Sequence, residues 1–539
     1  MGYVNQLINT ALTKKQAVIF CYQHPYQATI RAMPLFTKNQ LIKTLLLPAL
    51  GAPILGALGV LGFAPFYFHP VSIASLVGLI YVWRSCETAK QAAYVGFMYG
   101  LGLFGVGFYW IYISLHTYGG MPPIMAGLCT FLLAAFMSLF TAATGALSKR
   151  ISVNQKHAFL IAVPIFWALT DWVRSWIFTG FPWLTIGYSQ LPQSPLAGYI
   201  PLIGVYGVSF ITVMVASLTS ALLIKDLPTS CKRAALLALL TIIITGGLLK
   251  LVEWTTPVKQ AISVSLLQGN IDQAIKWAPE IAEQTLNRYL DMAEQSTSKL
   301  IIMPETAMPV LSSNMPPEIL TRMKQHAIKN NGDILVGMVE RENSEYFNSV
   351  LSFGTAETAV YRKSHLVPFG EFIPFKMVFG WIYRDWLNMP LSDLSRGSIH
   401  QQPMPVAGEK VAVNICYEDV FGEEIIRQLP AATLLVNVSN DAWYGDSYAA
   451  EQHMQFSQAR ALETGRMMLR ATNTGATAII NHKGHVVAHA PHLVQTTLDG
   501  TAQGYTGTTP YVIWGNWPFV LFSFITIILL WRRNTMVRK

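Results

Sequence analysis

The sequence predicts a polytopic α-helical membrane domain of about eight transmembrane helices, with a globular α/β domain inserted before the last of them. Of the 539 residues only 12% are charged, whereas 52% are hydrophobic. The hydrophobic residues gather in uninterrupted stretches of about 17 to 25 residues, the length of helix that crosses a bilayer. Residues 257–510 depart from this pattern, because they mix charged residues with short β-rich runs.

Eight apolar stretches are candidate membrane spans, five of them clear and three weaker. The clear ones are 44–63, 92–114, 121–147, 197–224 and 511–531, and the weaker ones are 70–83, 158–178 and 234–249. The stretch 158–178 carries Asp171 and Arg174, which are close enough along a helix to pair with each other inside the bundle. This pair is predicted to be structural.

The basic residues predict which ends of the spans face the cytoplasm, since cytoplasmic loops retain Lys and Arg. They lie before the first stretch and after the second, fourth, sixth and eighth, whereas the connections 64–69, 115–120 and 175–196 contain none. Both termini are therefore predicted to be cytoplasmic. The predicted order is a cytoplasmic extension without a cleaved signal peptide (1–40), seven helices (41–256), an outer domain (257–510), the eighth helix (511–531) and a basic cytoplasmic tail (532–539).

The formal net charge of +9 does not indicate a nucleic-acid partner, because it is unevenly distributed. Residues 257–510 hold 19 basic and 25 acidic residues, a net charge of −6, and the remainder hold 19 and 4, a net charge of +15. The positive charge therefore belongs to the cytoplasmic face of the membrane domain.

Cysteine usage indicates one free thiol in the outer domain. The five cysteines are Cys21, Cys86, Cys129, Cys231 and Cys416, and only the last lies within 257–510. A lone cysteine there has no partner for an internal disulfide, so a free reactive thiol is one interpretation. A single buried cysteine is more often a small apolar filler.

The inserted domain is predicted to be a layered α/β domain. Its β-rich runs include "AISVSLLQG" from Ala261, "KLIIMPE" from Lys299, "KVAVNICYE" from Lys410 and "ATLLVNVSN" from Ala432. Helical patterns lie between several of these runs, as in "PEIAEQTLNRYLDMAEQS" from Pro279. Strands interleaved with helices favour an α/β architecture.

Three ionisable side chains follow β-like runs and are expected to meet at one edge of the sheet. Glu305 ends "LIIMPE", Lys363 ends "VYRK" and Cys416 ends "AVNIC". A single Glu or Lys usually lies on a solvated face. Three such residues at the ends of three apolar strands instead form the arrangement that an activated thiol requires.

The chemistry of a thiol assigns roles to these residues. A free thiol has a pKa of about 8.5 and is mostly protonated at neutral pH, so Glu305 is predicted to be the general base for Cys416. Lys363, with the backbone N–H after Cys416, is predicted to stabilise the oxyanion of a tetrahedral intermediate. Glu371 is expected to hold the lysine charged and aimed, and Glu418 either to anchor the nucleophile's turn or to assist proton transfer.

The roles of two residues near Cys416 are less defined. Tyr417 fits either a pocket wall or a strand residue, and Asp419 has no predicted role.

The order Glu, Lys, Cys, together with "PE", "HLVPFGEF" and "CYE", resembles the nitrilase superfamily. A nitrilase-like domain placed before the last of eight spans resembles the apolipoprotein N-acyltransferase family. Further motifs that carry this resemblance are "GFPWLTIGYSQ" from Gly180, "QGNIDQAIKW" from Gln268, "SNDAWYG" from Ser439, "LRATNTG" from Leu469 and "GNWP" from Gly515.

This resemblance implies an αββα sandwich in the periplasm, attached to the bacterial inner membrane, and a ping-pong acyl transfer. Cys416 is expected to take an acyl chain from a membrane phospholipid, phosphatidylethanolamine above all, as a thioester. The α-amine of the N-terminal diacylglyceryl-cysteine of an apolipoprotein is then expected to accept the chain, the last step of bacterial lipoprotein maturation. No cofactor and no metal are expected, and the enzyme is expected to be a monomer.

Several aromatic residues near the site allow two interpretations. Trp277 is either a core aromatic or a wall of the acyl pocket; the resemblance favours the pocket, to which Trp443 is also assigned. The segment 375–390, with Phe379, Trp381 and Trp386, is either a core helix or an amphipathic arm in the membrane interface.

Two other functions stay open on the sequence alone. A membrane-tethered nitrilase-type amidase would use the same three residues with water as acceptor. A transporter or assembly platform would use the outer domain only for binding.

Overall fold

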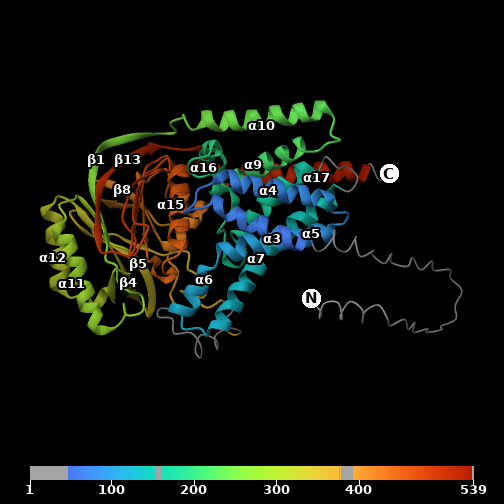
Figure 1. Ribbon diagram of the computed structural model, residues 1–539. Coiled ribbons are helices and arrows are strands. Elements are labelled where there is room, and N and C mark those ends of the chain that lie inside the picture. The colour runs from blue at the N-terminus through green and yellow to red at the C-terminus, as the bar shows by residue number, and fades with distance from the viewer. Residues whose placement is uncertain (1–46, 153–158, 375–376, 378–392, 537–539) are drawn as a thin grey trace. The chain divides into compact units, whose positions relative to one another are not determined.

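The computed structural model describes residues 47–152, 159–374, 377 and 393–536, all within one compact unit, Leu45–Lys539 (Figure 1). Each of the eight stretches predicted as spans contains a helix. The helices of this part are α3 (Leu47–Gly59), α4 (His69–Ser85), α5 (Ala89–Gly107), α6 (Trp110–Ile113), α7 (Pro123–Ile151), α8 (Phe159–Arg174), α9 (Ile200–Leu222), α10 (Thr229–Leu249), α16 (Pro510–Trp514) and α17 (Trp517–Met536).

Four helices of the described residues are long and apolar enough to cross a membrane. They cover Pro123–Ile151, Pro195–Leu222, Thr229–Leu249 and Trp517–Met536, and a bent pair, Ala89–Gly107 with Trp110–Tyr118, makes a fifth if it is counted as one span. The described residues therefore form an apolar helical domain. Fewer of its helices are long and apolar enough to cross a membrane than the eight spans that the sequence predicts.

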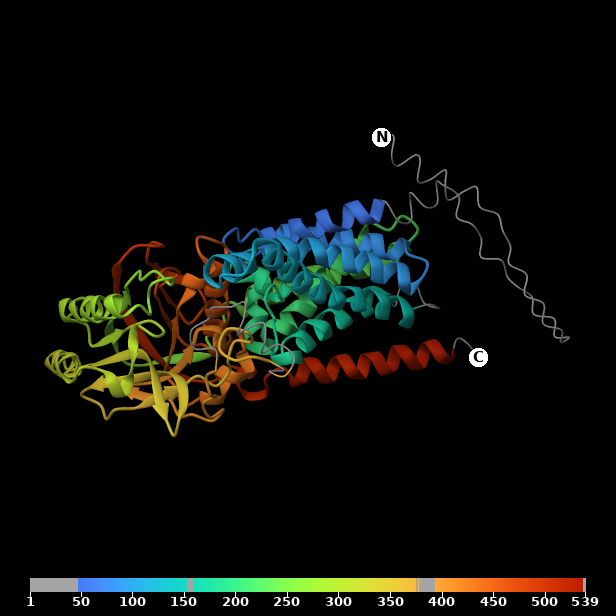
Figure 2. The same cartoon turned by 90° about the horizontal axis from the view of Figure 1, so that it is seen from below.

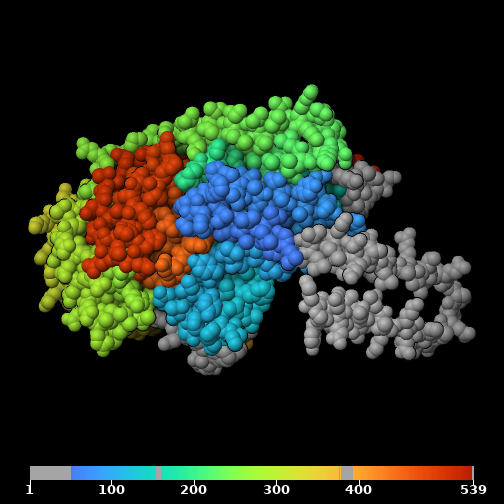
Figure 3. Space-filling view, viewed as in Figure 1, coloured from blue at the N-terminus to red at the C-terminus, as the bar shows by residue number. Residues whose placement is uncertain are grey.

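Apolar side chains point outward from α10 and α17. Leu237 and Leu248 on α10 are 66% and 60% exposed, and Ile525 and Leu529 on α17 are 57% and 59% exposed. Figure 3 shows α10, in green, at the surface. Apolar side chains exposed along a whole helix are stable in an apolar solvent, so these faces fit contact with lipid.

The predicted pair within α8 is confirmed. The Arg174 guanidinium donates a hydrogen bond to the Asp171 carboxylate at 2.9 Å, and both side chains are buried. Arg174 also donates to the carbonyl of Trp183 at 2.6 Å and to the hydroxyl of Thr185 at 3.2 Å. The pair therefore anchors the loop that follows α8 to the helix bundle.

Two sheets form the core of the inserted domain. The seven-stranded sheet has the order β13-β1-β2-β4-β5-β6, with β3 paired to β4, and the six-stranded sheet has the order β12-β11-β10-β9-β8-β7. The strands of the first sheet are β1 (Thr255–Gln268), β2 (Leu300–Ile302), β3 (Met308–Leu311), β4 (Asp333–Glu342), β5 (Glu345–Gly354), β6 (Val360–Arg362) and β13 (Thr496–Gly507). Those of the second are β7 (Met404–Val406), β8 (Glu409–Ile415), β9 (Leu434–Ser439), β10 (Met468–Thr472), β11 (Ala478–Ile480) and β12 (Val486–His489).

The alternation of side chains along each strand explains why the sheets stack. Ile302 of β2 and Val413 of β8 belong to one buried cluster between the sheets. Ile301, one residue away on β2, belongs instead to the cluster under α11 (Pro279–Gln295) and α12 (Pro317–Lys329). Because successive side chains of a strand point to opposite faces, both faces of each sheet are buried.

Helices cover the two outer faces of the stacked sheets. Figures 1 and 2 show α11 and α12 along the outer face of the first sheet. On the second sheet, Leu435 of β9 clusters with Met454 of α15 (Ala449–Thr464). The result is the four-layered αββα sandwich that the resemblance implies.

α15 belongs to both parts of the molecule. Its Phe456 and Ala459 lie in the large apolar cluster of the membrane helices. Its Gln452 accepts hydrogen bonds from the indole N–H groups of Trp183 at 2.7 Å and of Trp110 at 3.3 Å. These contacts dock the sandwich on the helical domain.

We predict that Gly337→Ala in β4 destabilises the fold. A Cβ atom at this position would lie 2.2 Å from the carbonyl oxygen of Pro304 and 2.8 Å from the amide of Thr306, so the neighbouring turn must move. Overpacking of this kind costs about 1–3 kcal/mol, measurable as a lower unfolding temperature in detergent. The matched variant Gly247→Ala in α10 meets no atom within 4 Å and should stabilise the helix by up to about 1 kcal/mol. Equal unfolding temperatures for the two variants would contradict this packing.

Candidate active site

The three predicted residues each follow a strand, but the strands belong to two sheets. Glu305 lies three residues beyond β2 and Lys363 directly follows β6, both in the seven-stranded sheet, whereas Cys416 directly follows β8 of the six-stranded sheet. The prediction of a single sheet edge was therefore wrong. Stacking of the two sheets brings the three strand ends together. Glu305 and Lys363 are close enough to Cys416 that both change the pKa of its thiol.

The Glu305 carboxylate is buried and held by three donors. Its Oε1 accepts hydrogen bonds from the side-chain amide of Asn348 at 2.7 Å and from Lys363 Nζ at 3.3 Å, and its Oε2 accepts from the backbone N–H of Asn440 at 2.9 Å. All three groups are donors, so both oxygens of the carboxylate act as hydrogen-bond acceptors. A general base likewise has to accept a proton at such an oxygen.

Lys363 lies between two carboxylates. Its Nζ donates to Glu371 Oε1 at 2.9 Å and to Glu305 Oε1 at 3.3 Å, and the side chain is only 1% exposed. Burial alone would lower the pKa of Lys363, but Glu371 and Glu305 outweigh burial and raise the pKa above its ordinary value. The lysine is therefore a fixed positive charge, and Glu371 has the position that the sequence predicts for it.

The backbone at Cys416 is strained. Its φ of +54° lies in the left-handed region, which L-residues other than Gly, Asn and Asp rarely adopt. Two donors hold its carbonyl oxygen: the side-chain amide of Asn437 at 3.1 Å and Nε2 of His453 at 3.2 Å. A strained turn directly after a strand is typical of the position of a nucleophile in enzymes whose nucleophile follows a strand.

The thiol itself is protonated at rest. Burial and the nearby Glu305 carboxylate raise the pKa of Cys416 well above its ordinary value, although Lys363 opposes them. A buried thiol of this kind needs a base to receive its proton as it attacks.

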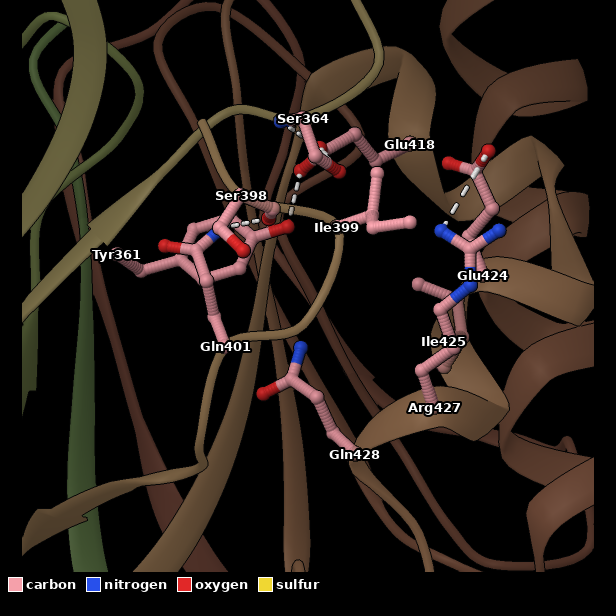
Figure 4. A pocket seen from close by; sticks show the side chains of 10 residues that line it. All are labelled: Tyr361, Ser364, Ser398, Ile399, Gln401, Glu418, Glu424, Ile425, Arg427 and Gln428. Atoms are coloured by element: carbon pink, nitrogen blue, oxygen red, sulfur yellow. Dashed lines mark hydrogen bonds and ion pairs between the residues drawn. The ribbon is translucent and has the colours of Figure 1, made fainter. Parts of the chain in front are cut away.

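Glu418 makes the contacts expected for the first of its two predicted roles, anchoring the turn. Its Oε2 accepts from the backbone N–H of Ile415 at 2.7 Å and from the Tyr361 hydroxyl at 2.9 Å, and its Oε1 accepts from the backbone N–H of Ser364 at 2.6 Å. Figure 4 shows Glu418 beside Ser364 and Tyr361 at a small cavity of about 20 Å³, room for one water-sized group. Glu418 thus ties the turn of Cys416 to the segment that carries Lys363.

Tyr417 lies in the 3₁₀ turn Cys416–Val420 and not in a strand. Its hydroxyl donates to the carbonyl of Gly180 at 3.0 Å, and its ring packs edge-on against Phe421. Gly180 belongs to the loop after α8, so Tyr417 links the nucleophile's turn to the membrane domain.

A buried network of four charged residues lies beneath the turn, and the sequence did not reveal it. Arg470 donates to Asp441 Oδ2 at 2.7 Å and to Asp419 Oδ2 at 3.1 Å. His453 lies between the other oxygens of the same carboxylates, with Nδ1 2.9 Å from Asp441 and Nε2 3.0 Å from Asp419. Asp419 therefore helps to position His453 against the Cys416 carbonyl.

The one signal of this network in the sequence is Arg470, a charged residue inside the apolar run of β10. An arginine that is 0% exposed requires carboxylate partners.

Lys276 is a second residue that the sequence analysis missed. Its buried Nζ donates to the hydroxyl of Thr306 at 2.7 Å and lies 3.4 Å from the carbonyl oxygen of Glu305. Burial lowers the pKa of Lys276 to about 8, against the opposing effect of Glu305. This lysine fixes the turn that carries Glu305.

The predicted pocket residues lie at the margin of the site. Trp277 is half-buried, with the Lys276 ammonium 5.9 Å from its ring centroid. Trp443 is also half-buried, and its carbonyl accepts a hydrogen bond from Ser114 of the membrane domain at 2.7 Å. Their role as acyl-pocket walls stays a prediction, and Phe379, Trp381 and Trp386 lie outside the described residues.

Comparison with known protein families assigns both parts of the chain. Residues 263–511 match the family model of carbon-nitrogen hydrolases, which agrees with the αββα sandwich and defines the class of the inserted domain. Residues 55–218 match the model of the apolipoprotein N-acyltransferase N-terminal domain.

Full-length relatives identify the family. An apolipoprotein N-acyltransferase of Nitrosomonas europaea is 48% identical over 478 residues, which cover 88% of this chain and 95% of that protein. One of Chromobacterium violaceum is 40% identical over 506 residues, 91% of this chain and 95% of that protein. The chain belongs to the apolipoprotein N-acyltransferase family.

We predict that the His453 network makes stability depend on pH. Burial and Arg470 favour the neutral ring, but Asp419 and Asp441 outweigh them and raise the pKa of His453 from 6.5 to about 9. Since the folded-state pKa is the higher one, this stabilisation is complete below pH 6.5 and is lost as the pH rises through 9. A shift of this size corresponds to about 3 kcal/mol.

The measurement compares the unfolding temperatures of the wild type and His453→Gln between pH 6 and 10. The difference should be largest at pH 6 and should shrink steadily above pH 6.5. A difference that stays constant over this range would mean that His453 is not charged in the folded protein.

Proposed function

We propose that this chain transfers an acyl chain from a membrane phospholipid to the N-terminal α-amine of apolipoproteins through a thioester on Cys416. One observation carries the proposal: a buried thiol on a strained turn lies beside a buried carboxylate and lysine pair, in a chain of the apolipoprotein N-acyltransferase family. The first part of the reaction forms the thioester. The thiol proton passes to Glu305 while the sulfur attacks the carbonyl carbon of the ester.

The positive charge of Lys363 and the backbone N–H of Tyr417 then stabilise the oxyanion of the tetrahedral intermediate. Collapse of the intermediate breaks the ester bond. The alkoxide of the lysophospholipid leaves with the proton from Glu305, and the acyl chain stays on sulfur.

The second part regenerates the enzyme. The free α-amine of a diacylglyceryl-cysteine attacks the thioester carbonyl and gives up a proton to Glu305, forming a second oxyanion at the same donors. The thiolate leaves and recovers that proton, and the product carries an amide. The two half-reactions use one base and one oxyanion site in turn, as a ping-pong mechanism requires.

An apolar groove in the membrane domain supports a lipid donor. It has a volume of about 410 Å³ between α5, α6 and α7, and its lining includes Leu101, Tyr109, Tyr112 and Phe131. The volume falls within the range of small-molecule binding pockets, roughly 300–1,000 Å³. The Tyr109 hydroxyl accepts a hydrogen bond at 3.3 Å from the backbone N–H of Tyr448, which follows the segment of Trp443. An acyl chain in this groove would therefore end close to the catalytic domain.

The remaining features of the proposal rest on the predictions made from the sequence. Eight spans with both ends in the cytoplasm would place the catalytic domain in the periplasm, beside the inner membrane. The proposed boundaries are 1–40 for the extension, 41–256 and 511–531 for the spans, 257–510 for the catalytic domain and 532–539 for the tail. Phosphatidylethanolamine is the proposed donor, Trp277 and Trp443 the proposed pocket walls, and a monomer the proposed functional unit.

The proposal predicts that Cys416→Ala abolishes transfer and that Glu305→Gln slows it about 10²- to 10⁴-fold, the usual contribution of a general base. The assay uses the purified full chain in vesicles of labelled phosphatidylethanolamine with a synthetic diacylglyceryl lipopeptide, and mass spectrometry of both. The wild type should gain one acyl mass that disappears when the lipopeptide is added.

The controls are Cys231→Ala and Glu357→Gln, which remove an exposed thiol and an exposed carboxylate and should behave like the wild type. Normal lipopeptide acylation by Cys416→Ala would overturn the proposal.

The same assay separates the second candidate, a membrane-tethered amidase or hydrolase. That function rests on the carbon-nitrogen hydrolase match of residues 263–511. With water as acceptor, the products would be free fatty acid and lysophospholipid, and the lipopeptide would stay unmodified.

A further inference from the structure

Three metal-ligating side chains meet on the sandwich, outside the candidate active site. They are Glu451, His489 and His492, each of which offers one ligand atom, and these atoms all lie within 4.8 Å of one another. The sequence predicts no metal site. His489 and His492 are three residues apart in the chain, but the fold alone brings Glu451 to them.

The three ligands come from different elements. Glu451 lies in the first turn of α15, His489 ends β12, and His492 follows in the loop toward β13. Glu451 and His492 are half-buried and His489 is exposed; the carboxylate is 19% exposed and the imidazoles of His489 and His492 are 32% and 31% exposed. The side chains therefore converge on one point from a helix, a strand and a loop.

Two of the three separations are close to those between ligands around a tetrahedral metal ion. Glu451 Oε1 lies 2.9 Å from His492 Nε2 and 3.5 Å from His489 Nε2. Bonds of about 2.0–2.1 Å from Zn²⁺ to imidazole nitrogen and carboxylate oxygen, at tetrahedral angles, put neighbouring ligand atoms about 3.3 Å apart. The two measured distances lie on either side of this value.

One ligand atom is also poorly satisfied by the protein. His492 Nε2 is buried, and its one close contact among the described residues is Glu451 Oε1 at 2.9 Å, an ion-pair distance without the angles of a well-formed hydrogen bond. A buried imidazole nitrogen that faces a carboxylate without a well-formed hydrogen bond is suited to share a cation with it.

We propose that Glu451, His489 and His492 bind one divalent transition-metal ion, Zn²⁺ foremost, with water at the fourth position. Two imidazoles and one carboxylate form a ligand set that suits Zn²⁺ and does not suit Mg²⁺ or Ca²⁺, which prefer oxygen ligands. The ion clips the loop after β12 to the first turn of α15.

The clipped loop is connected to the turn of the catalytic base. The carbonyl of Leu493 accepts a hydrogen bond from the Asn270 side chain at 2.9 Å, and the backbone N–H of Asn270 donates to Asn473 at 2.8 Å. Asn473 in turn donates to Asn440 at 3.1 Å, whose backbone N–H binds Glu305. The metal site is thus a structural clip at the end of a hydrogen-bonded path to the active site.

The test uses the full-length protein, stripped with EDTA and titrated with Co²⁺ or Zn²⁺ alone. We expect one tightly bound equivalent, with the strong visible absorption of tetrahedral Co²⁺ and its displacement by Zn²⁺. The backbone amides of Ala490 and Leu493, which donate to Thr477 and Thr474, should exchange their hydrogens at least tenfold more slowly with metal than without it.

Variants locate the site. His489→Ala and His492→Ala should each weaken binding at least tenfold, and Glu451→Gln should weaken it as well, whereas His485→Ala, an exposed histidine on the same hairpin, should bind like the wild type. The titration of the wild-type protein decides the proposal even if a variant fails to fold. Absence of saturable binding, or equally tight binding by the double variant His489→Ala/His492→Ala, would overturn it.

Discussion

The site depends on the burial of Lys363 between Glu305 and Glu371. An ammonium group that is 1% exposed is costly to desolvate, and removal of one partner from a buried ion pair leaves an uncompensated charge. The fold therefore has to supply both carboxylates at once, one from the turn after β2 and one from the segment after β6. Burial and the Glu305 carboxylate also raise the pKa of the Cys416 thiol well above its ordinary value, so a protonated thiol lies near this charged pair.

The need to balance buried charge also explains the network of four charged residues beneath the turn of Cys416. Asp419 and Asp441 balance Arg470 and His453, and the balanced network holds the carbonyl of a residue with strained backbone. Strain at a nucleophile persists only where the surroundings over-determine the conformation. The contacts of α15 extend this rigidity to the membrane domain, because Gln452 is adjacent to His453 and binds two indoles of that domain. The turn of Cys416 is thereby held in one frame with the membrane domain.

Much of this arrangement follows from local sequence patterns. The β-rich runs that end at Cys416, Lys363 and Glu305 predict the strands and the three site residues, since alternation and turn signals are local. The pairing of Asp171 with Arg174 is equally local. The assignment of Cys416 to a second sheet is not, because which strands pair depends on contacts between residues far apart in the chain.

Other residues of the site were not predicted for the same reason, because their contacts join segments that are far apart in the chain. Asn348 looks like an ordinary strand residue until β5 places it against Glu305 and Glu371. Lys276 looks like a surface lysine until its loop folds over Thr306. The eight predicted spans illustrate a different limit: hydropathy marks where a helix is apolar, but packing and helix breaks decide how long each helix is.

The most direct test of the account is a structure of the full-length protein determined in lipid after incubation with phospholipid and without an acceptor. The account predicts acyl density bonded to Cys416 Sγ, with Lys363 Nζ within hydrogen-bond distance, about 2.7–3.1 Å, of the thioester oxygen and Glu305 on the opposite side of the sulfur. Acyl density on another residue, or a lysine that points away from the thioester oxygen, would contradict it.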